Sequence, residues 1–453
     1  MKYYDVVFVT IAERDVDFFL NIAKNVNGHV AFLSLYEPGD KKLKKNNFDV
    51  YQVSNLLKEK YKLDKNYDDS LLEKSVNHES LTFDRSKLKL KKKYIEYFSV
   101  FNNLFSNIRV RYIVQELGGF IGPISIYNVA IKNSINHIFL EPSIIAGRLI
   151  FLHNKLNYKI KDEIINNSES KFAKTYYLKI LNDNLIIKSV KDNHHYIKNI
   201  LFKVFNFTNF KKLTKKIFYK ILGLHQEYDA TYNYVKKYLN CIYNAHRSKK
   251  IYSNINEISN LKKIIFFPLH VKLDFTLTIR SPQFLDQFKI IETLCNNYPK
   301  NIILIKEHPA MVGMFDYNEI LKLKKKYKNF YISEPSIYVH QIFKFSKNIL
   351  TINSKVGFEA ACFGLNVFCL SKSSYSNLPN VKLLNFNDLM IGKYIFSEKL
   401  NHTQENLSSY LIEFIEKNII NSVKTELYFN EETNIKNFSN NINKLLFDEG
   451  VLI

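Results

Sequence analysis

The chain has 453 residues, which is too many for one hydrophobic core and predicts two domains, or two domains with an insertion. Its formal net charge of +22 suits an anionic partner (a nucleic acid, an anionic membrane or an acidic substrate), although lysines scattered over a solvated surface explain it equally well. Lysine heavily outnumbers arginine, and because base and phosphate recognition favours arginine, we expect no nucleic-acid partner.

Residues 1–160 predict a doubly wound α/β domain. Runs of β-branched and apolar residues alternate with an amphipathic helix at Asp15–Val26 and a charged, mostly helical stretch that ends near residue 105. Strands are expected at Tyr4–Thr10, His29–Leu35, Phe48–Val53, Arg109–Gln115 and His137–Leu140.

Residues 161–258 differ in composition and predict a basic helical insertion or linker. Lysine, asparagine, tyrosine and phenylalanine dominate, and glycine is almost absent. Residues 196–226 contain no acidic residue, and their lysines are interleaved with apolar residues. Such a segment can lie on an anionic membrane surface. An ordinary helical linker with a basic outer face stays equally open.

Residues 259–453 predict a second Rossmann-like domain that ends in C-terminal helices. Ligands of open parallel sheets bind beyond the carboxyl ends of the strands, and each motif considered below follows a predicted strand. Strands are expected at Ile264–Phe267, Ile302–Ile305, Phe330–Ile332, Ile349–Ile352 and Val367–Leu370. Helices are expected at Ser281–Asn296, Asn318–Tyr327, Ile337–Phe345 and Lys355–Phe363.

Two strand ends of the second domain carry groups that bind phosphate. Lys306 supplies a point charge and His308 a hydrogen bond, while Pro309 fixes the chain beside them. A strand-end turn with a solvated lysine is the alternative. The next motif, at residues 351–360, predicts a helix that Asn353 or Ser354 caps, and the amino end of a helix binds phosphate.

Further polar residues can complete that site. Glu359 can reach ribose hydroxyls or simply favour the first helical turn, and Lys355 can offset a phosphate or a donor carboxylate. His270 and Thr276 follow the first strand of the second domain and can face the same ligand, or they belong to an ordinary polar loop.

The first domain offers carboxylates at two strand ends. Glu116 precedes Gly118 and Gly119, which permit a tight turn beside a ligand, and a carboxylate there can deprotonate an acceptor hydroxyl or attack an anomeric carbon. A turn with an exposed glutamate is the alternative. Glu141 and Arg148 form a second cluster, in which Arg148 can hold a sugar carboxylate or pair with Glu141.

Several function classes lack their usual motifs. The sequence has no GxGxxG, Walker A, HExxH, GxSxG or DxD-like pattern, so hydride transfer, P-loop chemistry, serine hydrolysis and a metal–nucleotide site are not indicated. Four cysteines without metal-ligand spacing fit a reducing cytoplasm, and Cys362 and Cys369 are expected to be buried thiols. The amino-terminal residues lack a signal-peptide core, and no stretch reaches the roughly 18 apolar residues of a membrane span.

These motifs resemble those of the capsule polysaccharide biosynthesis family, which includes bacterial β-Kdo transferases, and more distantly those of GT-B sialyltransferases. Leu117 stands where sialyltransferases usually carry a second acid, which is a departure from an inverting sialyltransferase. Whether Glu116 attacks the anomeric carbon, with retention, or acts as a base, with inversion, stays open. The resembling stretches are QELGG (115–119), LEPSIIAGRL (140–149), FFPLHVKLDFT (266–276), IKEHP (305–309), SEPS (333–336) and TINSKVGFEA (351–360).

The resemblance implies a GT-B fold, in which two Rossmann-like domains face a cleft, and a transfer that needs no metal or other cofactor. It places the phosphate of CMP on His308 and Lys306 and on Asn353 with Ser354. It implies that Glu334 contacts the nucleoside and that Glu116 performs the chemistry.

The sequence therefore predicts a glycosyltransferase that moves an acidic keto-sugar, Kdo or a related nonulosonic acid, from a CMP-sugar to a capsule, lipopolysaccharide or glycolipid acceptor. The alternatives are a GT-B transferase that uses a UDP- or GDP-sugar, and a non-catalytic basic protein that binds polysaccharide or membrane. We expect a cytoplasmic protein, peripheral to the inner face of the inner membrane if the basic segment binds lipid.

Overall fold

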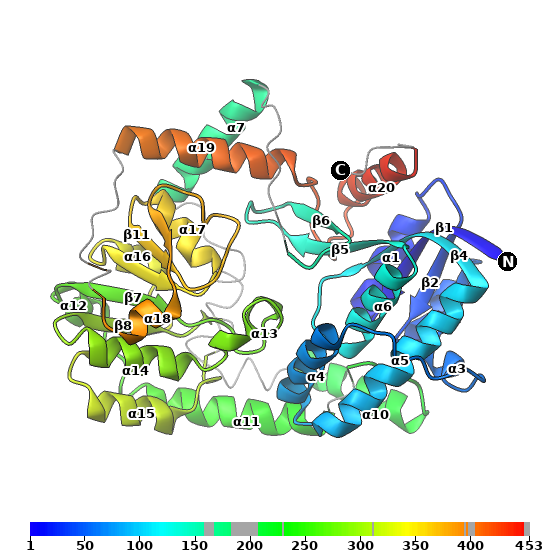
Figure 1. Ribbon diagram of the computed structural model, residues 1–453, viewed down its shortest axis with the longest axis horizontal. Helices are drawn as coiled ribbons and strands as arrows, with labels where there is room; N and C mark the ends of the chain where they lie inside the picture. The colour runs from blue at the N-terminus through cyan, green and yellow to red at the C-terminus, as the bar shows by residue number, and fades with distance from the viewer. Residues whose placement is uncertain are drawn as a thin grey trace.

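The chain forms two α/β domains that lie side by side (Figure 1). A computed structural model describes residues 1–157, 167–182, 207–228, 231–309, 312–393, 396 and 404–447. Each domain is built on one six-stranded sheet with helices on both faces, so the predicted pair of Rossmann-like domains, the α/β arrangement of the GT-B class, is confirmed. All four cysteines are free and buried, as expected for Cys362 and Cys369.

The sheet of domain 1 has the strand order β3-β2-β1-β4-β5-β6. Its neighbours are parallel except for β5 and β6, which pair antiparallel. The central strands read as continuous apolar runs because helices cover both faces. The strands are β1 (Lys2–Thr10), β2 (Val30–Ser34), β3 (Asp49–Gln52), β4 (Ile108–Glu116), β5 (Asn136–Pro142) and β6 (Leu149–His153). The helices are α1 (Glu13–Ala23), η1 (Glu37–Gly39), α2 (Asp40–Lys44), α3 (Val53–Leu56), α4 (Asp69–Phe83), α5 (Lys87–Asn107) and α6 (Ile121–Lys132).

Domain 2 repeats this winding, with the order β9-β8-β7-β10-β11-β12 and parallel pairing throughout. Its strands are β7 (Ile264–Pro268), β8 (Ile302–Lys306), β9 (Phe330–Ser333), β10 (Asn348–Thr351), β11 (Asn366–Cys369) and β12 (Val381–Leu383). Its helices are α12 (Ile255–Ser259), α13 (Phe275–Thr278), η2 (Pro282–Phe284), α14 (Gln287–Asn297), α15 (Tyr317–Lys326), α16 (Val339–Phe343), α17 (Lys355–Cys362) and α18 (Phe386–Met390).

The predicted strands are confirmed as β1 to β5 and β7 to β11, with shifted ends. The two last strands, β6 and β12, were not predicted, because each is a short edge strand without a clear alternation. The helix expected to begin at Ser281 begins at Gln287 instead. Pro282 starts a separate 3-10 turn, and the Asp286 side chain then caps α14 by accepting from the amide of Lys289.

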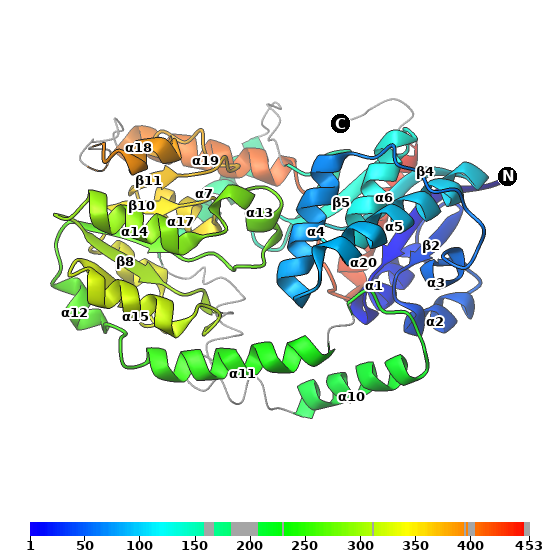
Figure 2. The ribbon, with the colours of Figure 1, turned by 60° about the horizontal axis from the view of Figure 1, so that its bottom comes forward.

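The predicted insertion is not a separate unit, because its helices attach to different domains. On α7 (Asn167–Leu181), Ala173 and Tyr176 are buried in the core of domain 2. On α11 (Thr231–Ser248), the amide of Asn244 donates to the carbonyl of Gly313. In contrast, α10 (Phe207–Ile221) lies beside domain 1, and Figure 2 shows α10 and α11 following one another along one edge of the molecule.

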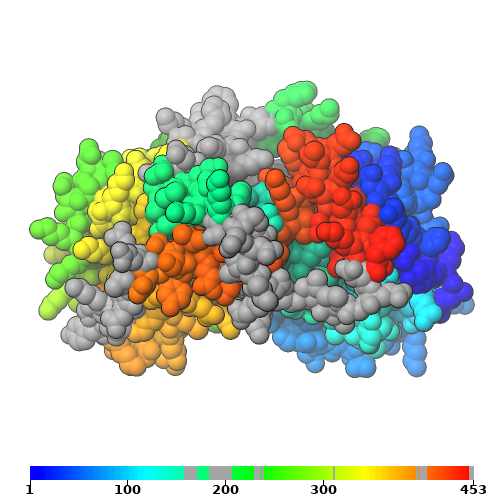
Figure 3. Space-filling model, turned by 90° about the horizontal axis from the view of Figure 1, so that it is seen from above, coloured from blue at the N-terminus to red at the C-terminus, as the bar shows by residue number. Residues whose placement is uncertain are grey.

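The carboxyl-terminal helices also divide between the domains. On domain 2, α19 (Gln404–Ile420) packs against α7, whereas α20 (Glu432–Phe447) crosses to domain 1. There Phe438 meets the ring of Phe18 edge-on with 5.5 Å between ring centroids. Figure 3 shows the red C-terminal residues against the blue domain and the orange helix beside α7. Residues 259–453 are therefore not one domain, because the apolar face of α20 completes the core of domain 1.

Candidate active site

Each sheet has a topological switch point, at which the connections from two neighbouring strands run in opposite directions across the sheet. Ligands of such sheets bind at this switch point. In domain 1 it lies between β1 and β4, which lead to Asp15 and to Glu116. In domain 2 it lies between β7 and β10, which lead to His270 and to Asn353. Four polar side chains thus occupy the two positions at which the topology predicts ligands.

Glu116 ends β4 and is held from two other elements. Its carboxylate receives a hydrogen bond from Arg14 Nη2 at 3.0 Å and another from the hydroxyl of Tyr428. The Arg14 guanidinium also lies 4.3 Å from the centre of the Tyr428 ring. The side chain of Glu116 remains 28% exposed, so one edge of this fixed carboxylate is open to solvent.

Asp15 lies beside Glu116 and was not singled out from the sequence. Its Oδ2 atom accepts from the amides of Ile11 and Ala12 at 2.7 and 2.9 Å, which satisfies the start of α1. Burial, and then the charge of Glu116, raise the pKa of Asp15 to about 6. An acidic residue at the third position of a helix is usually interpreted as a capping residue. Only the position of Asp15 shortly after β1 could have indicated that it is a second carboxylate of the site.

The loop after Glu116 brings the two domains into contact. A Cβ atom on Gly119 would lie 2.9 Å from His78 Cγ and 2.9 Å from Ile279 Cγ1, so this glycine permits the close approach of domain 2. A Cβ atom on Gly118 would meet nothing within 4 Å. Space for a ligand is thus available at Gly118, whereas Gly119 serves packing.

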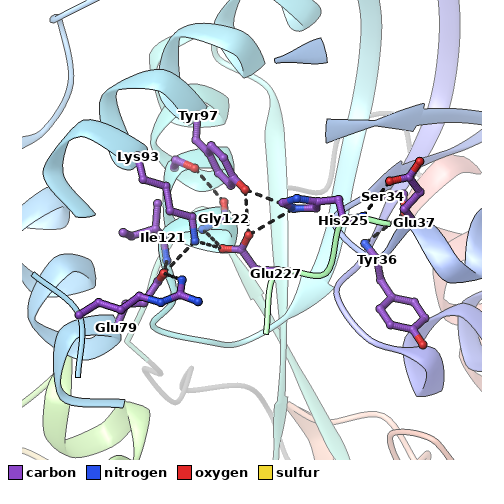
Figure 4. A network of polar contacts seen from close by, with 12 residues as sticks. Ser34, Tyr36, Glu37, Glu79, Lys93, Tyr97, Ile121, Gly122, His225 and Glu227 are labelled. Atoms are coloured by element: carbon purple, nitrogen blue, oxygen red, sulfur yellow. Dashed lines mark hydrogen bonds and ion pairs between the residues drawn. The ribbon is translucent and has the colours of Figure 1, made fainter. Parts of the chain in front are cut away.

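The amino end of α6, which follows this loop, is already occupied by carboxylates (Figure 4). Glu79 accepts from the amide of Ile121 at 3.2 Å, and Glu227 accepts from the amide of Gly122 at 3.3 Å. Lys93 Nζ lies between them and donates to both carboxylates at 2.8 Å. This helix end is therefore satisfied within the chain, so a phosphate would be repelled here.

The network of Figure 4 also fixes the segment that leads out of α10. The hydroxyl of Tyr97 donates to Glu227 at 3.0 Å, and His225 Nε2 lies 3.7 Å from the same carboxylate. Burial raises the pKa of Glu227, but Lys93 and His225 outweigh it and lower the pKa to about 2. Glu227 is thus a buried, ionised anchor directly behind the Glu116 loop.

In domain 2, the ammonium of Lys306 is buried at the end of β8. Among the described residues, Lys306 Nζ donates to the carbonyl of Glu307 at 3.4 Å. Burial lowers the pKa of Lys306 to about 8, against the opposing charge of Glu307. The Glu307 carboxylate, whose pKa burial raises to about 7, turns instead to the amide of Gly313 and the hydroxyl of Tyr252. Lys306 is left as a poorly compensated cation.

His270 and Asn353 form a second buried pair beside it. The amide of Asn353 donates to His270 Nε2 at 3.3 Å, so the ring proton resides on Nδ1, which has no partner in the part of the chain that the structure describes. Burial, with the nearby His308, lowers the pKa of His270 to about 3. The Oδ1 atom of Asn353 is buried and equally without a described partner. Among the described residues, one buried donor and one buried acceptor thus lack a partner.

The predicted helix after Asn353 is confirmed as α17, with Ser354 at its N-cap position. The hydroxyl of Ser354 does not cap the helix but lies 3.0 Å from Thr351 Oγ1. Lys355 Nζ donates to the carbonyl of Ser143 in domain 1 at 2.6 Å. In the structure Lys355 thus joins the domains, instead of facing a phosphate.

Three other predicted donor-site residues border this region. His308 and Pro309 are half-buried and follow Glu307, just beyond the end of β8. Glu334 follows β9 and accepts from the hydroxyl of Ser336 at 3.2 Å. The end of β8 adjoins β7 in the sheet and that of β9 lies one strand further, so the three residues lie on the same edge as His270.

Four residues that the sequence predicted for the substrate or donor site make contacts within the protein instead. Arg148 donates to Ile419 O and Ser422 O at 2.6 and 2.7 Å, so it closes the carboxyl end of α19 instead of presenting a fork to a sugar. Glu359 pairs with His340 Nε2 at 3.2 Å inside domain 2. The amide of Thr276 is held by the Asp274 side chain at 2.7 Å.

The fourth, Glu141, pairs with Arg280 of domain 2 and not with Arg148. Arg280 Nη1 and Nη2 donate to its two oxygens at 2.7 and 2.8 Å. A further contact between the domains joins His78 Nδ1 to Thr278 Oγ1 at 2.8 Å. The strand-end loops of both sheets are therefore held together, with the carboxylates on one side and the buried cation on the other.

Comparison with known proteins gives one family match. The family described as capsule polysaccharide biosynthesis protein matches residues 165–378. Protein FixF of Sinorhizobium fredii (strain NBRC 101917 / NGR234) is 27% identical over 115 residues, which are 25% of this chain and 27% of that protein. The chain thus matches about a quarter of the length of this curated relative.

Solved structures show low similarity over long spans. Thermosulfurimonas dismutans KpsC, a beta Kdo 2,7 transferase, is 11% identical with a TM-score of 0.38, and the match covers 97% of this chain and 99% of that one. The MnaA-UDP structure from S. aureus is 11% identical with a TM-score of 0.30, and the match covers 98% and 97%.

The family match includes the strand ends that carry His270, Lys306 and Asn353. In the part of the chain that the structure describes, no helix is long and apolar enough to cross a membrane. Over residues 165–378, just under half of its length, this chain is similar to capsule polysaccharide biosynthesis proteins.

Proposed function

We propose that the chain is a glycosyltransferase of capsule polysaccharide biosynthesis that transfers an acidic keto-sugar, Kdo or a related nonulosonic acid, from a CMP-sugar. The observation that carries this proposal is the opposition of two sets of groups. In domain 1, carboxylates lie at the strand ends between β1 and β4. In domain 2, a buried cation lies at the corresponding strand ends near β7 and β10, together with buried polar atoms that have no partner among the described residues.

The donor phosphate belongs on domain 2. A phosphate oxygen beside Lys306 would compensate the desolvated ammonium, and another would accept the proton of His270 Nδ1. The free Oδ1 atom of Asn353 needs a donor, such as a ribose hydroxyl or an amino group of the base. His308 and Ser354 adjoin these groups and would complete the phosphate site, while Glu334 would contact the nucleoside.

The reaction belongs at Glu116. If Glu116 takes the proton of the acceptor hydroxyl, the acceptor oxygen attacks the anomeric carbon while the bond to the phosphate oxygen breaks and CMP leaves with the electron pair. If Glu116 attacks first, a covalent sugar–enzyme intermediate forms and configuration is retained. Asp15, with its raised pKa, is suited to exchange a proton with Glu116 near neutral pH.

The groups of domain 2 would also stabilise the leaving group. Negative charge develops on the CMP phosphate as the bond breaks, and Lys306 with His270 offers a preorganised charge and donor there. We propose on this basis that transfer requires no metal ion.

A thermal-shift panel of CMP, UMP, UDP, GDP and cytidine tests the donor. A ligand at 100 times its dissociation constant adds about 2.7 kcal/mol, which shifts the melting temperature on the order of 5–10 °C for domains of this size. A response to CMP alone supports the proposal, and His308→Ala should then weaken CMP more than cytidine. A response to UDP or GDP alone would mean that the donor is a UDP- or GDP-sugar instead of a CMP-sugar. No response to any nucleotide would favour a non-catalytic binding protein.

A further inference from the structure

The helix α10 packs on domain 1 through its polar side. Lys215 Nζ forms an ion pair with Glu13 at the start of α1, and the ring of Tyr219 meets that of Tyr36 edge-on with 6.5 Å between centroids. No residue of α10 is buried. The contacts of Lys215 and Tyr219 with domain 1 therefore use a charged and a phenolic group.

Exposed apolar residues of α10 form a separate face of the helix. Phe207 is 81% exposed, Phe210 65% and Ile221 77%, and the face also contains Ile217 and Phe218. Their spacing of 3, 10, 11 and 14 residues from Phe207 places all five on one side of a helix with 3.6 residues per turn. Helices on the surface of a globular protein turn such a face inward, whereas α10 turns it outward.

Lys211 borders this face on one side and Lys220 on the other, whereas Lys212 and Lys216 lie on the opposite side of the helix. The helix carries Lys211, Lys212, Lys215, Lys216 and Lys220, and it contains no acidic residue. Lysine stems can lie along an apolar surface while their ammonium groups reach polar headgroups. A partner that covers this side must therefore offer an apolar layer next to negative charge.

Charge decides between the partners that could do so. A second copy of the chain carries the same net charge of +22 and would set lysines against lysines. An anionic bilayer presents acyl chains under negative headgroups, which complements both parts of the helix. We propose that α10 lies in the headgroup region of an anionic membrane, with Phe207, Phe210, Ile217, Phe218 and Ile221 inserted toward the acyl chains.

The segment after α10 ties this helix to the candidate active site. The amide of Glu227 donates to the carbonyl of Leu35 at 3.0 Å, and its carboxylate is part of the buried network with Lys93 (Figure 4). Tyr228 then packs on Phe120 of the Glu116 loop, with 4.4 Å between ring centroids. A bilayer-bound α10 would hold the Glu116 edge near the membrane, which suits a lipid-linked acceptor; this last step rests on the proposed glycosyl transfer.

Co-sedimentation of the full chain with vesicles tests the proposal. Vesicles of phosphatidylglycerol and phosphatidylcholine should bind the wild-type protein at low salt, and vesicles of phosphatidylcholine alone should bind at least fivefold less. The double variant Phe210→Ser/Phe218→Ser and the double variant Lys211→Glu/Lys220→Glu should each reduce the bound fraction at least fivefold. Both pairs are exposed, so the melting temperature should stay unchanged.

The matched control is Lys436→Glu/Lys444→Glu on α20, which changes the charge by the same amount on exposed residues of another face (Figures 1 and 2). It should bind vesicles as the wild type does. Equal loss in this control, or wild-type binding that ignores the α10 variants, would overturn the proposal. So would a dimer that only Phe210→Ser/Phe218→Ser dissociates. Vesicle binding without any nucleotide response would leave the membrane site standing and remove the proposed transfer.

Discussion

Arg280 of domain 2 donates two parallel hydrogen bonds to Glu141 of domain 1, and its Nε and Nη2 atoms also donate to the carbonyl of Leu156. Both side chains are less than a fifth exposed, at 15% and 19%. This pair therefore sets the distance between the strand-end loops that face each other at the candidate active site.

We expect Arg280→Ala and Glu141→Ala to be coupled by about 1–2 kcal/mol in a double-mutant cycle of urea unfolding, because each single variant leaves one partly buried charge unpaired. The exposed pair of Lys42 and Asp17 provides the control and should show much weaker coupling. Independent effects of Arg280→Ala and Glu141→Ala would mean that the pair does not hold the domains together.

Glu116→Gln should reduce sugar transfer at least 10³-fold, because an amide can neither accept the acceptor proton nor attack the anomeric carbon. The binding of CMP, measured by calorimetry, should change less than twofold, since the phosphate site lies on domain 2. The control Glu73→Gln, on the exposed side of α4, should leave both unchanged. Full transfer by Glu116→Gln would remove this residue from the chemistry.

Asp15 should make stability depend on pH in a direction opposite to that of most carboxylates. Its folded-state pKa of about 6 exceeds the unfolded value near 4, so its contribution is fully present below pH 4 and is lost as the pH rises through 6. Relative to wild type, Asp15→Asn should gain on the order of 1–3 kcal/mol of unfolding free energy between pH 4 and pH 8. Parallel urea titrations at both pH values measure this, and an unchanged difference would contradict the raised pKa.

Lys306 should make CMP binding depend on pH above neutrality. If only the ammonium form binds the phosphate, a free-protein pKa of about 8 makes CMP binding roughly tenfold weaker at pH 9 than at pH 7. Lys306→Arg keeps its charge and should bind with equal affinity at both pH values. Cytidine, which has no phosphate, is the control ligand, and a loss of cytidine affinity as large as that of CMP would place Lys306 away from the phosphate.

The sequence predicts this fold where a signal is local. Short β-branched runs mark the central strands, and polar residues directly after them put His270, Lys306 and Asn353 on one edge of a sheet. Contacts between distant segments carry no such signal. Arg148 meets Ser422, 274 residues later, and nothing near either residue predicts that pairing.

The same limit applies to the domain boundaries and to the pairing of charges. The apolar stripe of α20 predicts that the helix packs on something, but only the arrangement of both domains selects domain 1. The sequence makes Glu359 a candidate ligand contact, and its pairing with His340 at 3.2 Å becomes visible only once α16 lies against α17.

The position of α20 has a consequence for synthesis on the ribosome. Phe438 fills the core beside Phe18, yet it is translated roughly 300 residues after β6 completes the sheet of domain 1. At 5–20 residues per second this interval lasts on the order of 15–60 s. Throughout this interval, the apolar side chains of domain 1 that pack against α20, Phe18 among them, lie uncovered, and chaperones bind surfaces of this kind. Domain 1 therefore reaches its native core only after domain 2 and α19 have been synthesised.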